Sequence, residues 1–276
     1  MVDLYVERYL CPLGKTENVD NFNFLVGEMT YDSSDILCTL DVYSKFNDIK
    51  ENLYNFIIGN GGLGKSTYLK QIKNQLDRKK IPCILIELKT LNDESSLYDV
   101  LNEYCKNHLN SSVYILLDAV DEAIDCNVKN ISNKIGDAIT KLLTQYKIFN
   151  KYKLRNKNKI IQIKKKIKKN IKVLKIAKHF SQKSNSKTQI KTIITCRDNR
   201  VPDELVPKLK EIYNIKENNT YSLCRLTEEN VESIAVSLGC ETPGDFITKV
   251  KKYNLGCFAS SPITLKPLIE MYKQNK

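Results

Sequence analysis

One glycine-rich stretch, Gly59-Asn60-Gly61-Gly62-Leu63-Gly64-Lys65-Ser66-Thr67, constrains the fold of this chain more than any other part of it. It follows the apolar run of residues 55–58 and precedes a stretch with helical periodicity, which is the setting in which the spacing Gly-x4-Gly-Lys-Ser is meaningful. Glycines let the backbone take positive φ and approach a ligand closely. The freed amides and the N-terminus of the following helix then attract an anion. The stretch therefore predicts a P-loop, a loop that binds nucleotide phosphates.

The positions of the loop have separate expected roles. We expect Lys65 to reach the β- and γ-phosphates of ATP, and the Ser66 hydroxyl to bind Mg²⁺. The alternative interpretation is a glycine-rich turn that binds nothing. The residues predicted to contact ATP or ADP are Gly59, Asn60, Gly61, Gly62, Leu63, Gly64, Lys65, Ser66 and Thr67.

An acidic residue ends a later apolar run. Residues 113–117 are typical of a buried strand, and Asp118 follows them directly. A carboxylate there can hold Mg²⁺, directly or through water, opposite the Ser66 hydroxyl. The alternative is an aspartate that caps the next helix. Because the chain also has a P-loop, we predict that Ser66 and Asp118 are the metal ligands.

Two more carboxylates, Asp121 and Glu122, come three and four residues after Asp118. Either one is near enough in sequence to orient or activate the water that attacks the γ-phosphate. The alternative is that both are ordinary carboxylates in the first turn of a helix, where they favour the helix dipole. We predict a catalytic role for this pair, and the sequence does not decide between its two members.

Arg197 is the third predicted catalytic residue. It comes just after the apolar run of residues 192–195, at the level where a γ-phosphate would lie. An arginine there can stabilise the charge of the transferring phosphate or detect whether a γ-phosphate is present. The alternative is an ion pair with Asp198 or with a surface carboxylate.

The alternation of apolar runs and helical stretches predicts the fold. Strand-like runs occur at residues 55–58, 83–88, 113–117, 192–195 and 221–223, with helical periodicity between them. We predict an α/β protein, a three-layer α/β/α P-loop NTPase sandwich with a parallel five-stranded core sheet. Right-handed crossovers would bring the carboxyl ends of the strands, and the ligand, to one edge of the sheet.

The chain divides into three predicted regions. Residues 1–52 form a lead-in segment, and residues 53–225 form the P-loop NTPase core with a lysine-rich insert at 147–190. Residues 226–276 read as a small helical bundle, whose first helix is expected to be capped by Thr227.

Three stretches together resemble the NACHT group of STAND-class P-loop NTPases. They are the loop at 59–67, Leu-Leu-Asp-Ala-Val-Asp-Glu at 116–122 and Ile-Ile-Thr-Cys-Arg at 193–197. The most telling feature is the small residue Ala119 directly after the aspartate, with the acidic pair displaced beyond it. The segments 221–230 and 260–265 are similar as well, so the resemblance spans roughly Leu53 to Leu268, interrupted by the insert.

The resemblance implies a switch rather than a metabolic enzyme. Proteins of this kind hold ADP in a closed monomer, exchange it for ATP on sensing a ligand, and self-associate to drive an effector. It also implies that Pro262, in the helical domain, borders the nucleotide. Sensor and effector regions are not recognisable in this sequence. We therefore expect a fragment, a split subunit or a reduced form that works with a separate effector or sensor protein.

The positive charge of the chain is concentrated in the insert. Residues 147–190 contain fifteen Lys, one Arg and no Asp or Glu, and subtracting this +16 from the net charge of +12 leaves −4 elsewhere. Its apolar residues Ile163, Ile167, Ile171, Leu174 and Ala177 follow helical spacing. Such a helix can contact nucleic acid or an anionic membrane surface. The alternative is a solvated insert that packs its isoleucine stripe on the domain.

The cysteines, the N-terminal residues and the lengths of the apolar runs predict the cellular compartment. Nine cysteines are scattered without a Cys-x-x-Cys pair, which favours a reducing environment. The N-terminal residues lack the apolar core of a secretory signal, and no apolar run approaches the roughly 20 residues that span a bilayer. We expect a cytoplasmic protein without a membrane span.

The sequence is compatible with three functions. The first is an ATP-hydrolysing signalling module that self-associates in the ATP state, in defence or stress response. The second is a DNA-associated ATPase that contacts nucleic acid through the insert. The third is a small-molecule kinase, which would need an arginine-rich lid, whereas a GTPase is disfavoured because an Asn-Lys-x-Asp motif is missing.

Overall fold

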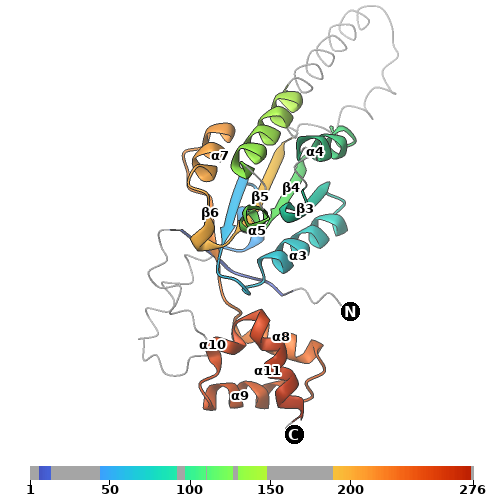
Figure 1. The fold of residues 1–276 in the computed structure, drawn as a ribbon. Coiled ribbons are helices and arrows are strands. Elements are labelled where there is room, and N and C mark those ends of the chain that lie inside the picture. The colour runs from blue at the N-terminus through green and yellow to red at the C-terminus, as the bar shows by residue number, and fades with distance from the viewer. Residues whose placement is uncertain are drawn as a thin grey trace, which may run out of the picture.

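The computed structural model describes residues 6–13, 44–91, 97–109, 111–126, 130–147 and 189–274. These residues form a sheet between two layers of helices, with a further group of helices beyond one end of the sandwich (Figure 1). The lysine-rich insert lies outside the described residues except at its two ends.

The sheet has six strands in the described part of the chain. Their spatial order is β1 (Leu10–Pro12), β6 (Thr220–Leu223), β2 (Tyr54–Ile58), β5 (Ile190–Cys196), β4 (Val113–Asp118) and β3 (Cys83–Glu87). Strands β2 to β6 are all parallel to one another, whereas β1 pairs antiparallel with β6. The predicted parallel five-stranded core is therefore confirmed. The strand patterns did not predict β1, which adds a sixth strand at one edge.

The strand that leads into the P-loop, β2, is central in the sheet. Ile57 pairs with Thr195 of β5 on one side and with Tyr221 of β6 on the other. Because β2, β4 and β5 are parallel, the loops that follow them leave the same edge of the sheet. Those loops carry the side chains predicted for catalysis and metal binding.

One face of the sheet is covered by α3 (Lys65–Arg78) and the short α2 (Phe46–Ile49). Leu69, Ile72 and Leu76 on α3 are buried against the inner side chains of β2, β4 and β5. This is the apolar face expected from their spacing of three and four residues. The helix predicted after the P-loop is thus confirmed, and it begins at Lys65.

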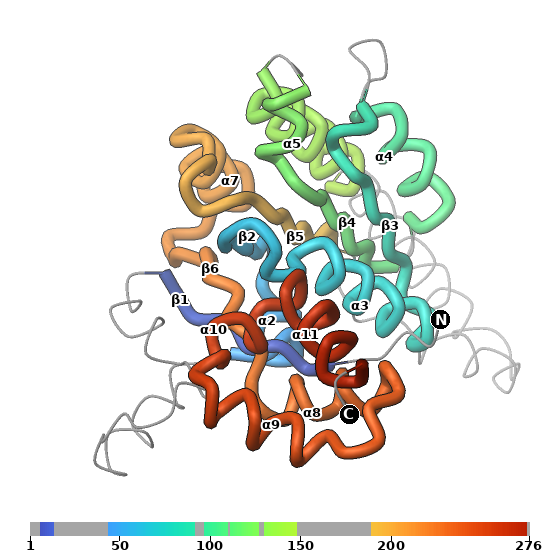
Figure 2. Tube along the Cα trace, turned by 60° about the horizontal axis from the view of Figure 1, so that its bottom comes forward, coloured from blue at the N-terminus to red at the C-terminus, as the bar shows by residue number. Residues whose placement is uncertain are grey.

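The opposite face carries a larger layer of helices, seen together with the strands in Figure 2. Tyr54 and Phe56 of β2 are fully buried beneath it, in the main core of the sandwich. This layer consists of α4 (Leu97–Lys106), α5 (Val120–Asp125), the helix over 131–147 and α7 (Leu205–Tyr213); the 3₁₀ turns η2 (Leu88–Thr90) and η3 (Asp198–Arg200) follow β3 and β5.

The sequence patterns did not predict α7. Pro207 is its third residue, and proline normally argues against a helix. In the first turn, however, the missing amide has no helical partner to lose, so the helix tolerates it. Leu205, Leu209 and Tyr213 then recur every four residues and are buried against the sheet.

The C-terminal helices form a group of their own below the sandwich in Figure 1. They are α8 (Glu228–Ser237), α9 (Pro243–Lys252), α10 (Gly256–Ala259) and α11 (Pro262–Gln274). As predicted, Thr227 caps α8. Its hydroxyl accepts a hydrogen bond from the backbone amide of Asn230 at 3.3 Å. Val231, Phe246 and Leu265 belong to a core that is separate from both cores of the sandwich.

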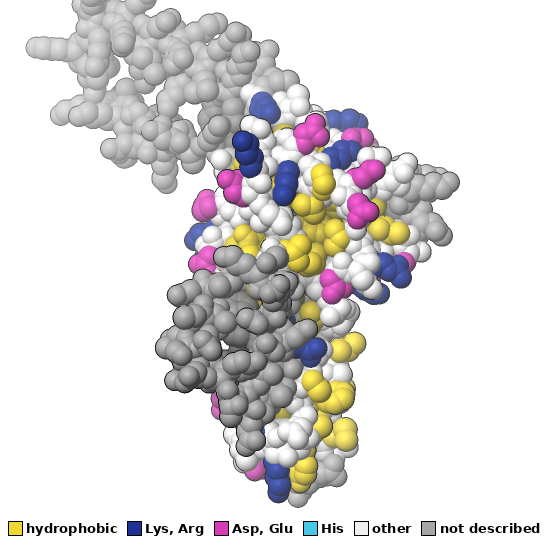
Figure 3. Space-filling view, turned by 90° about the vertical axis from the view of Figure 1, so that its left-hand side faces the viewer, with side chains coloured by type: hydrophobic (Ala, Val, Ile, Leu, Met, Phe, Trp, Pro, Cys, Tyr) yellow, Lys and Arg dark blue, Asp and Glu magenta, His cyan; other side chains and the backbone are white. Residues whose placement is uncertain are grey.

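The described surface carries charges of both signs. In the view of Figure 3, Lys and Arg alternate with Asp and Glu over the sandwich, and apolar side chains gather beside them and along the bundle. No helix in the described ranges combines the length and the apolar character needed to cross a bilayer. The concentration of positive charge found in the sequence therefore does not extend over this face.

Candidate nucleotide-binding site

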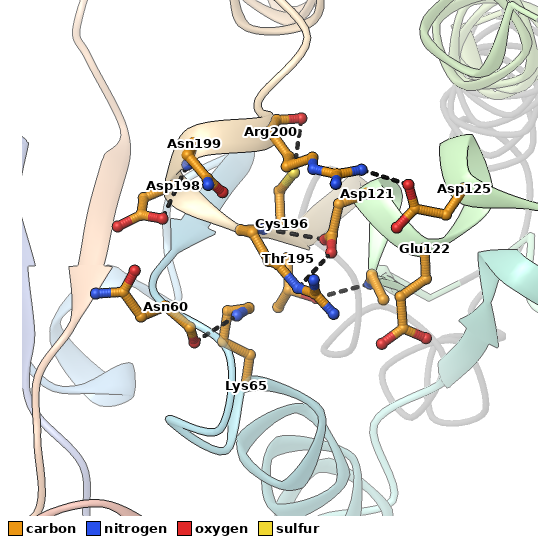
Figure 4. Close-up of polar contacts among 12 residues, drawn as sticks. Asn60, Lys65, Asp121, Glu122, Asp125, Thr195, Cys196, Asp198, Asn199 and Arg200 are labelled. Atoms are coloured by element: carbon orange, nitrogen blue, oxygen red, sulfur yellow. Dashed lines mark hydrogen bonds and ion pairs between the residues drawn. The ribbon is translucent and has the colours of Figure 1, made fainter.

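A cavity of about 390 Å³ opens at the carboxyl edge of the sheet, between the P-loop and the N-terminus of α11. Figure 4 shows two of the stretches that surround it, with Lys65 at the start of α3 and with Asp121 and Glu122 next to each other in α5. The predicted site residues that line it are Gly61, Gly62, Gly64, Lys65, Ser66, Thr67, Asp118, Asp121, Glu122, Arg197 and Pro262. Residues up to 200 positions apart in the sequence thus meet at one place.

The shape of the loop depends on two glycines in the left-handed region. Gly62 has φ +81° and Gly64 has φ +85°, conformations that other residues rarely adopt. A Cβ on Gly62 would lie 2.7 Å from Cγ2 of Ile263, and one on Gly64 would lie 3.3 Å from Cγ of Pro262. The glycines therefore give the loop its turn and also let the start of α11 approach it.

Lys65 is held by the loop itself. Its Nζ donates to the Gly59 carbonyl at 2.6 Å and to the Asn60 carbonyl at 3.0 Å. Burial lowers the pKa of the Lys65 amino group, and the Asp121 carboxylate works in the opposite direction. The ammonium thus sits beside the cavity, bonded to two carbonyls that carry only partial charge.

Asp118 is fixed by a neighbouring strand. Its side chain is buried, and the Thr195 hydroxyl donates to its Oδ1 at 2.6 Å. The same hydroxyl accepts a hydrogen bond from the Ala119 amide at 3.0 Å. Ala119 has φ +57°, so the chain turns sharply right after Asp118. A small residue suits this turn because the left-handed region is strained for branched and bulky side chains.

Arg197 contacts both carboxylate oxygens of Asp121. Arg197 Nε lies 3.0 Å from Asp121 Oδ2, and the Arg197 backbone amide donates to Oδ1 at 3.0 Å. Asp121 is 1% exposed, whereas the Arg197 side chain is 41% exposed. The arginine therefore pairs with a buried carboxylate of the site rather than with Asp198.

Glu122 has a different environment from its neighbour. Its side chain is partly exposed and points toward the P-loop side of the cavity in Figure 4. Lys89, in η2 after β3, forms an ion pair with it at 3.0 Å. Solvent-exposed ion pairs of this kind are weak, typically about 0–1 kcal/mol. Glu122 is therefore the more available of the two carboxylates.

The donor set suits a magnesium ion that is bound together with phosphate. Ser66 and Asp118 both line the cavity, one from the start of α3 and one from the end of β4. The described residues contain no group of three or more His, Cys, Asp or Glu side chains arranged to hold a metal. Mg²⁺ usually takes one or two carboxylates plus substrate phosphates, so this set fits it.

Three predicted residues lie elsewhere. Gly59, Asn60 and Leu63 line a second cavity, of about 400 Å³, on the other side of the loop. There the Asn60 amide faces Asp198, and with its nitrogen on that side it donates to both carboxylate oxygens at 3.0 and 3.1 Å. Arg225 also lines this second cavity.

Sequence reasoning missed several residues around the site. Thr195 had a usable signal, because it is a polar residue at the end of an apolar strand two positions before Arg197. Ile263 lies in the segment 260–265, next to the predicted Pro262, but the resemblance assigned it no contact with the P-loop. Lys89 had no signal, since it belongs to no motif and only the fold brings it to Glu122.

The central P-loop strand, the parallel sheet and the helix that begins at the P-loop lysine define the P-loop NTPase fold. No known family profile matches this chain, and no curated protein matches it in sequence.

Solved structures resemble it weakly. The replication initiator DnaA bound to AMPPCP and single-stranded DNA has a TM-score of 0.43 and 13% identity, and the match covers 90% of this chain and 64% of that one. Domain III of Thermotoga maritima DnaA has a TM-score of 0.43 and 16% identity, over 94% and 90% of the two chains. C. elegans PCH-2 has a TM-score of 0.40 and 11% identity, over 96% and 74%. Similarity this weak supports no assignment of function to this chain.

Thr195→Val tests the anchoring of Asp118. The substitution leaves the Asp118 carboxylate and the Ala119 amide without their buried partner, so we expect a loss of about 1–3 kcal/mol in the free energy of unfolding. Thr195→Ser keeps the hydroxyl and should lose clearly less. Urea unfolding of the nucleotide-free protein gives both values, and equal losses in the two variants would show that the hydroxyl does not hold Asp118.

Proposed function

We propose that this protein binds and slowly hydrolyses ATP, and that its nucleotide state works as a switch that controls self-association. The supporting observation is that Lys65, Asp118 and Arg197, which come from three separate stretches, line one cavity at the carboxyl edge of the sheet. A triphosphate needs a cation, a metal-holding carboxylate and a charge detector in one place, and this cavity brings the three together.

The binding step uses the P-loop backbone and Lys65. The amides near the start of α3 would surround the β-phosphate, helped by the positive end of the helix. Lys65 would exchange its two loop carbonyls for phosphate oxygens, which are stronger acceptors because they are charged. Ser66 and Asp118 would hold Mg²⁺, which when bound neutralises charge on the phosphates.

The hydrolytic step assigns different roles to the two displaced carboxylates. Glu122, which is partly exposed and forms an ion pair with the exposed Lys89, would orient and deprotonate the attacking water. Asp121, with both oxygens bonded to Arg197, would instead hold that arginine toward the γ-phosphate position. In this proposal Glu122 is the base, Arg197 stabilises charge, and Asp121 positions Arg197.

The switch would act through α11. Pro262 and Ile263 lie against Gly64 and Gly62, so the bundle contacts the same loop that would hold the phosphates. A ligand that moves the loop would therefore bias the position of the bundle. In keeping with the resemblance to STAND-class NTPases, we propose self-association in the ATP state, a separate effector or sensor protein, and a cytoplasmic location. We also retain the division at residues 1–52, 53–225 and 226–276.

A second candidate function is a DNA-associated ATPase. The observation that favours it is the +16 charge between residues 147 and 190, a segment outside the described residues. Such a segment would bind phosphate backbones without sequence preference.

Two measurements separate the candidates. For the switch, light scattering after size exclusion should show a monomer with ADP and a larger species with a nonhydrolysable ATP analogue. For the DNA-associated ATPase, a mobility shift should be strong, weaken steeply between low and high salt, and disappear when the lysines of residues 164–175 are replaced by glutamine. A nucleotide-independent monomer that binds DNA in this way would favour the second function.

Lys65→Ala tests nucleotide binding. Removing a charged donor from the phosphates should weaken ATP binding by about a hundredfold. The matched control is Lys70→Ala on the same helix, because Lys70 is exposed and its ion pair with Glu87 is long, at 3.6 Å. Calorimetric titration of ATP with Mg²⁺ measures both, and an unchanged affinity in Lys65→Ala would remove the P-loop assignment.

Glu122→Gln and Asp121→Asn should both slow turnover, by different routes. Loss of the base should slow single-turnover hydrolysis by about 10²–10⁴-fold while ATP stays bound. Asp121→Asn should have little further effect in an Arg197→Met background, because it acts through that arginine, whereas Glu122→Gln should still reduce the rate there. Equal additional losses in the two double variants would contradict the separate roles.

A further inference from the structure

The segment that precedes β1 runs between the bundle and the sheet, where Figure 2 shows it in blue. Its alternate side chains point inward. Val6 is buried in the core of the bundle and Leu10 in a core of the sandwich, with exposed fractions of 6% and 0%. Arg8 lies between them and is 5% exposed. By this alternation an arginine occupies an inward position where an apolar side chain would be expected.

The Arg8 guanidinium lies directly behind the P-loop. Its Nη1 donates to the Leu63 carbonyl at 3.1 Å and lies 3.4 Å from where a Cβ on Gly64 would be. Its Nη2 donates to the Cys224 carbonyl, at the connection from β6 to the bundle. Within the described residues, its buried Nε has no hydrogen-bond partner. Arg8 thus contacts the loop immediately before Lys65 and keeps a buried donor that the described residues do not use.

The charge of Arg8 has no matching carboxylate in the described part of the chain. The acidic neighbour in sequence, Glu7, pairs instead with Lys45 at 2.7 Å. Burial lowers the pKa of Arg8 to about 10, and the groups that oppose this are the Cys224 thiol and the Tyr68 phenol. A buried charge without a counterion is unfavourable. The positive N-terminal end of α3 begins next to Arg8 and adds to the excess of positive charge.

We infer that Arg8 is a positioning residue of the phosphate site, whose counterion is the bound polyphosphate on the other side of the loop. Arg8 supplies positive charge through the P-loop and fixes the Leu63 carbonyl so that the next amides turn toward the phosphates. It does not touch the reacting atoms. The inference rests on the proposed nucleotide binding and adds the lead-in segment to that site.

The inference predicts a dependence on ligand charge. The interaction between Arg8 and the ligand grows with the number of negative charges held in the loop, so it favours ATP over ADP and ADP over AMP. A purely structural brace that only shapes the loop would weaken ATP and ADP alike, because both place a β-phosphate against the loop amides. The ratio of ATP to ADP affinity therefore separates the two roles.

The test compares Arg8→Met, Arg8→Lys and a control in the full chain. Calorimetry at fixed salt measures the affinities for ATP, ADP and inorganic tripolyphosphate. We expect Arg8→Met to weaken ATP and tripolyphosphate by about tenfold and ADP by about threefold, with Arg8→Lys within about threefold of the wild type.

The control is Lys191→Met, which removes another buried cation at the start of β5, far from the P-loop edge. Lys191 donates to the Lys50 carbonyl at 2.9 Å and pairs with Glu51 at 2.8 Å. Its loss should lower the melting temperature and leave the ratio of ATP to ADP affinity unchanged.

The inference is overturned if Arg8→Met weakens ATP and ADP equally, or changes neither. Should Arg8→Met fail to fold, Arg8→Gln, which keeps a hydrogen-bond donor without the charge, carries the same expectation. Lys65→Ala separates this outcome from failure of the proposed function. If wild-type protein binds ATP and Lys65→Ala does not, an unchanged Arg8 variant contradicts only the role of Arg8.

Discussion

The loop between β2 and α3 has to turn successive backbone amides toward one point, and the rest of the structure depends on that constraint. Gly62 and Gly64 meet it in the left-handed region, and the space where their side chains would be is occupied by Ile263 and Pro262. The same two glycines therefore set both the shape of the anion site and the distance to the bundle. This shared dependence gives a physical route by which a ligand in the loop can bias the position of α11.

The charges around the cavity are only partly matched. Arg197 is neutralised by Asp121, and Glu122 pairs with Lys89. Lys65 and Arg8 instead donate to backbone carbonyls, which carry only partial charge. Together with the positive end of α3, these two cations leave the loop region short of negative charge. A bound polyphosphate would supply that charge, and this balance is the electrostatic basis of the proposed function.

The sequence predicted the parts of the protein whose signal is local. The P-loop, the parallel core strands, the helix beginning at Lys65 and the cap at Thr227 each follow from spacing or residue type within a short window. The sequence patterns missed β1 and α7. The first is a three-residue strand whose pairing partner, β6, lies some 200 residues away, and the second contains a proline that is harmless only in its first turn. Thr195 and Arg197 stand out in the sequence, but their pairing with Asp118 and Asp121 could not be predicted, because it depends on the order of the strands in the sheet.

A crystal structure of the protein with Mg²⁺ and a nonhydrolysable ATP analogue tests nucleotide binding at the P-loop most directly. We expect the β-phosphate against the amides at the start of α3, with Lys65 Nζ moved from the Gly59 and Asn60 carbonyls to phosphate oxygens. An analogue bound in the second cavity beside Arg225, with Lys65 still bonded to the loop carbonyls, would contradict this expectation.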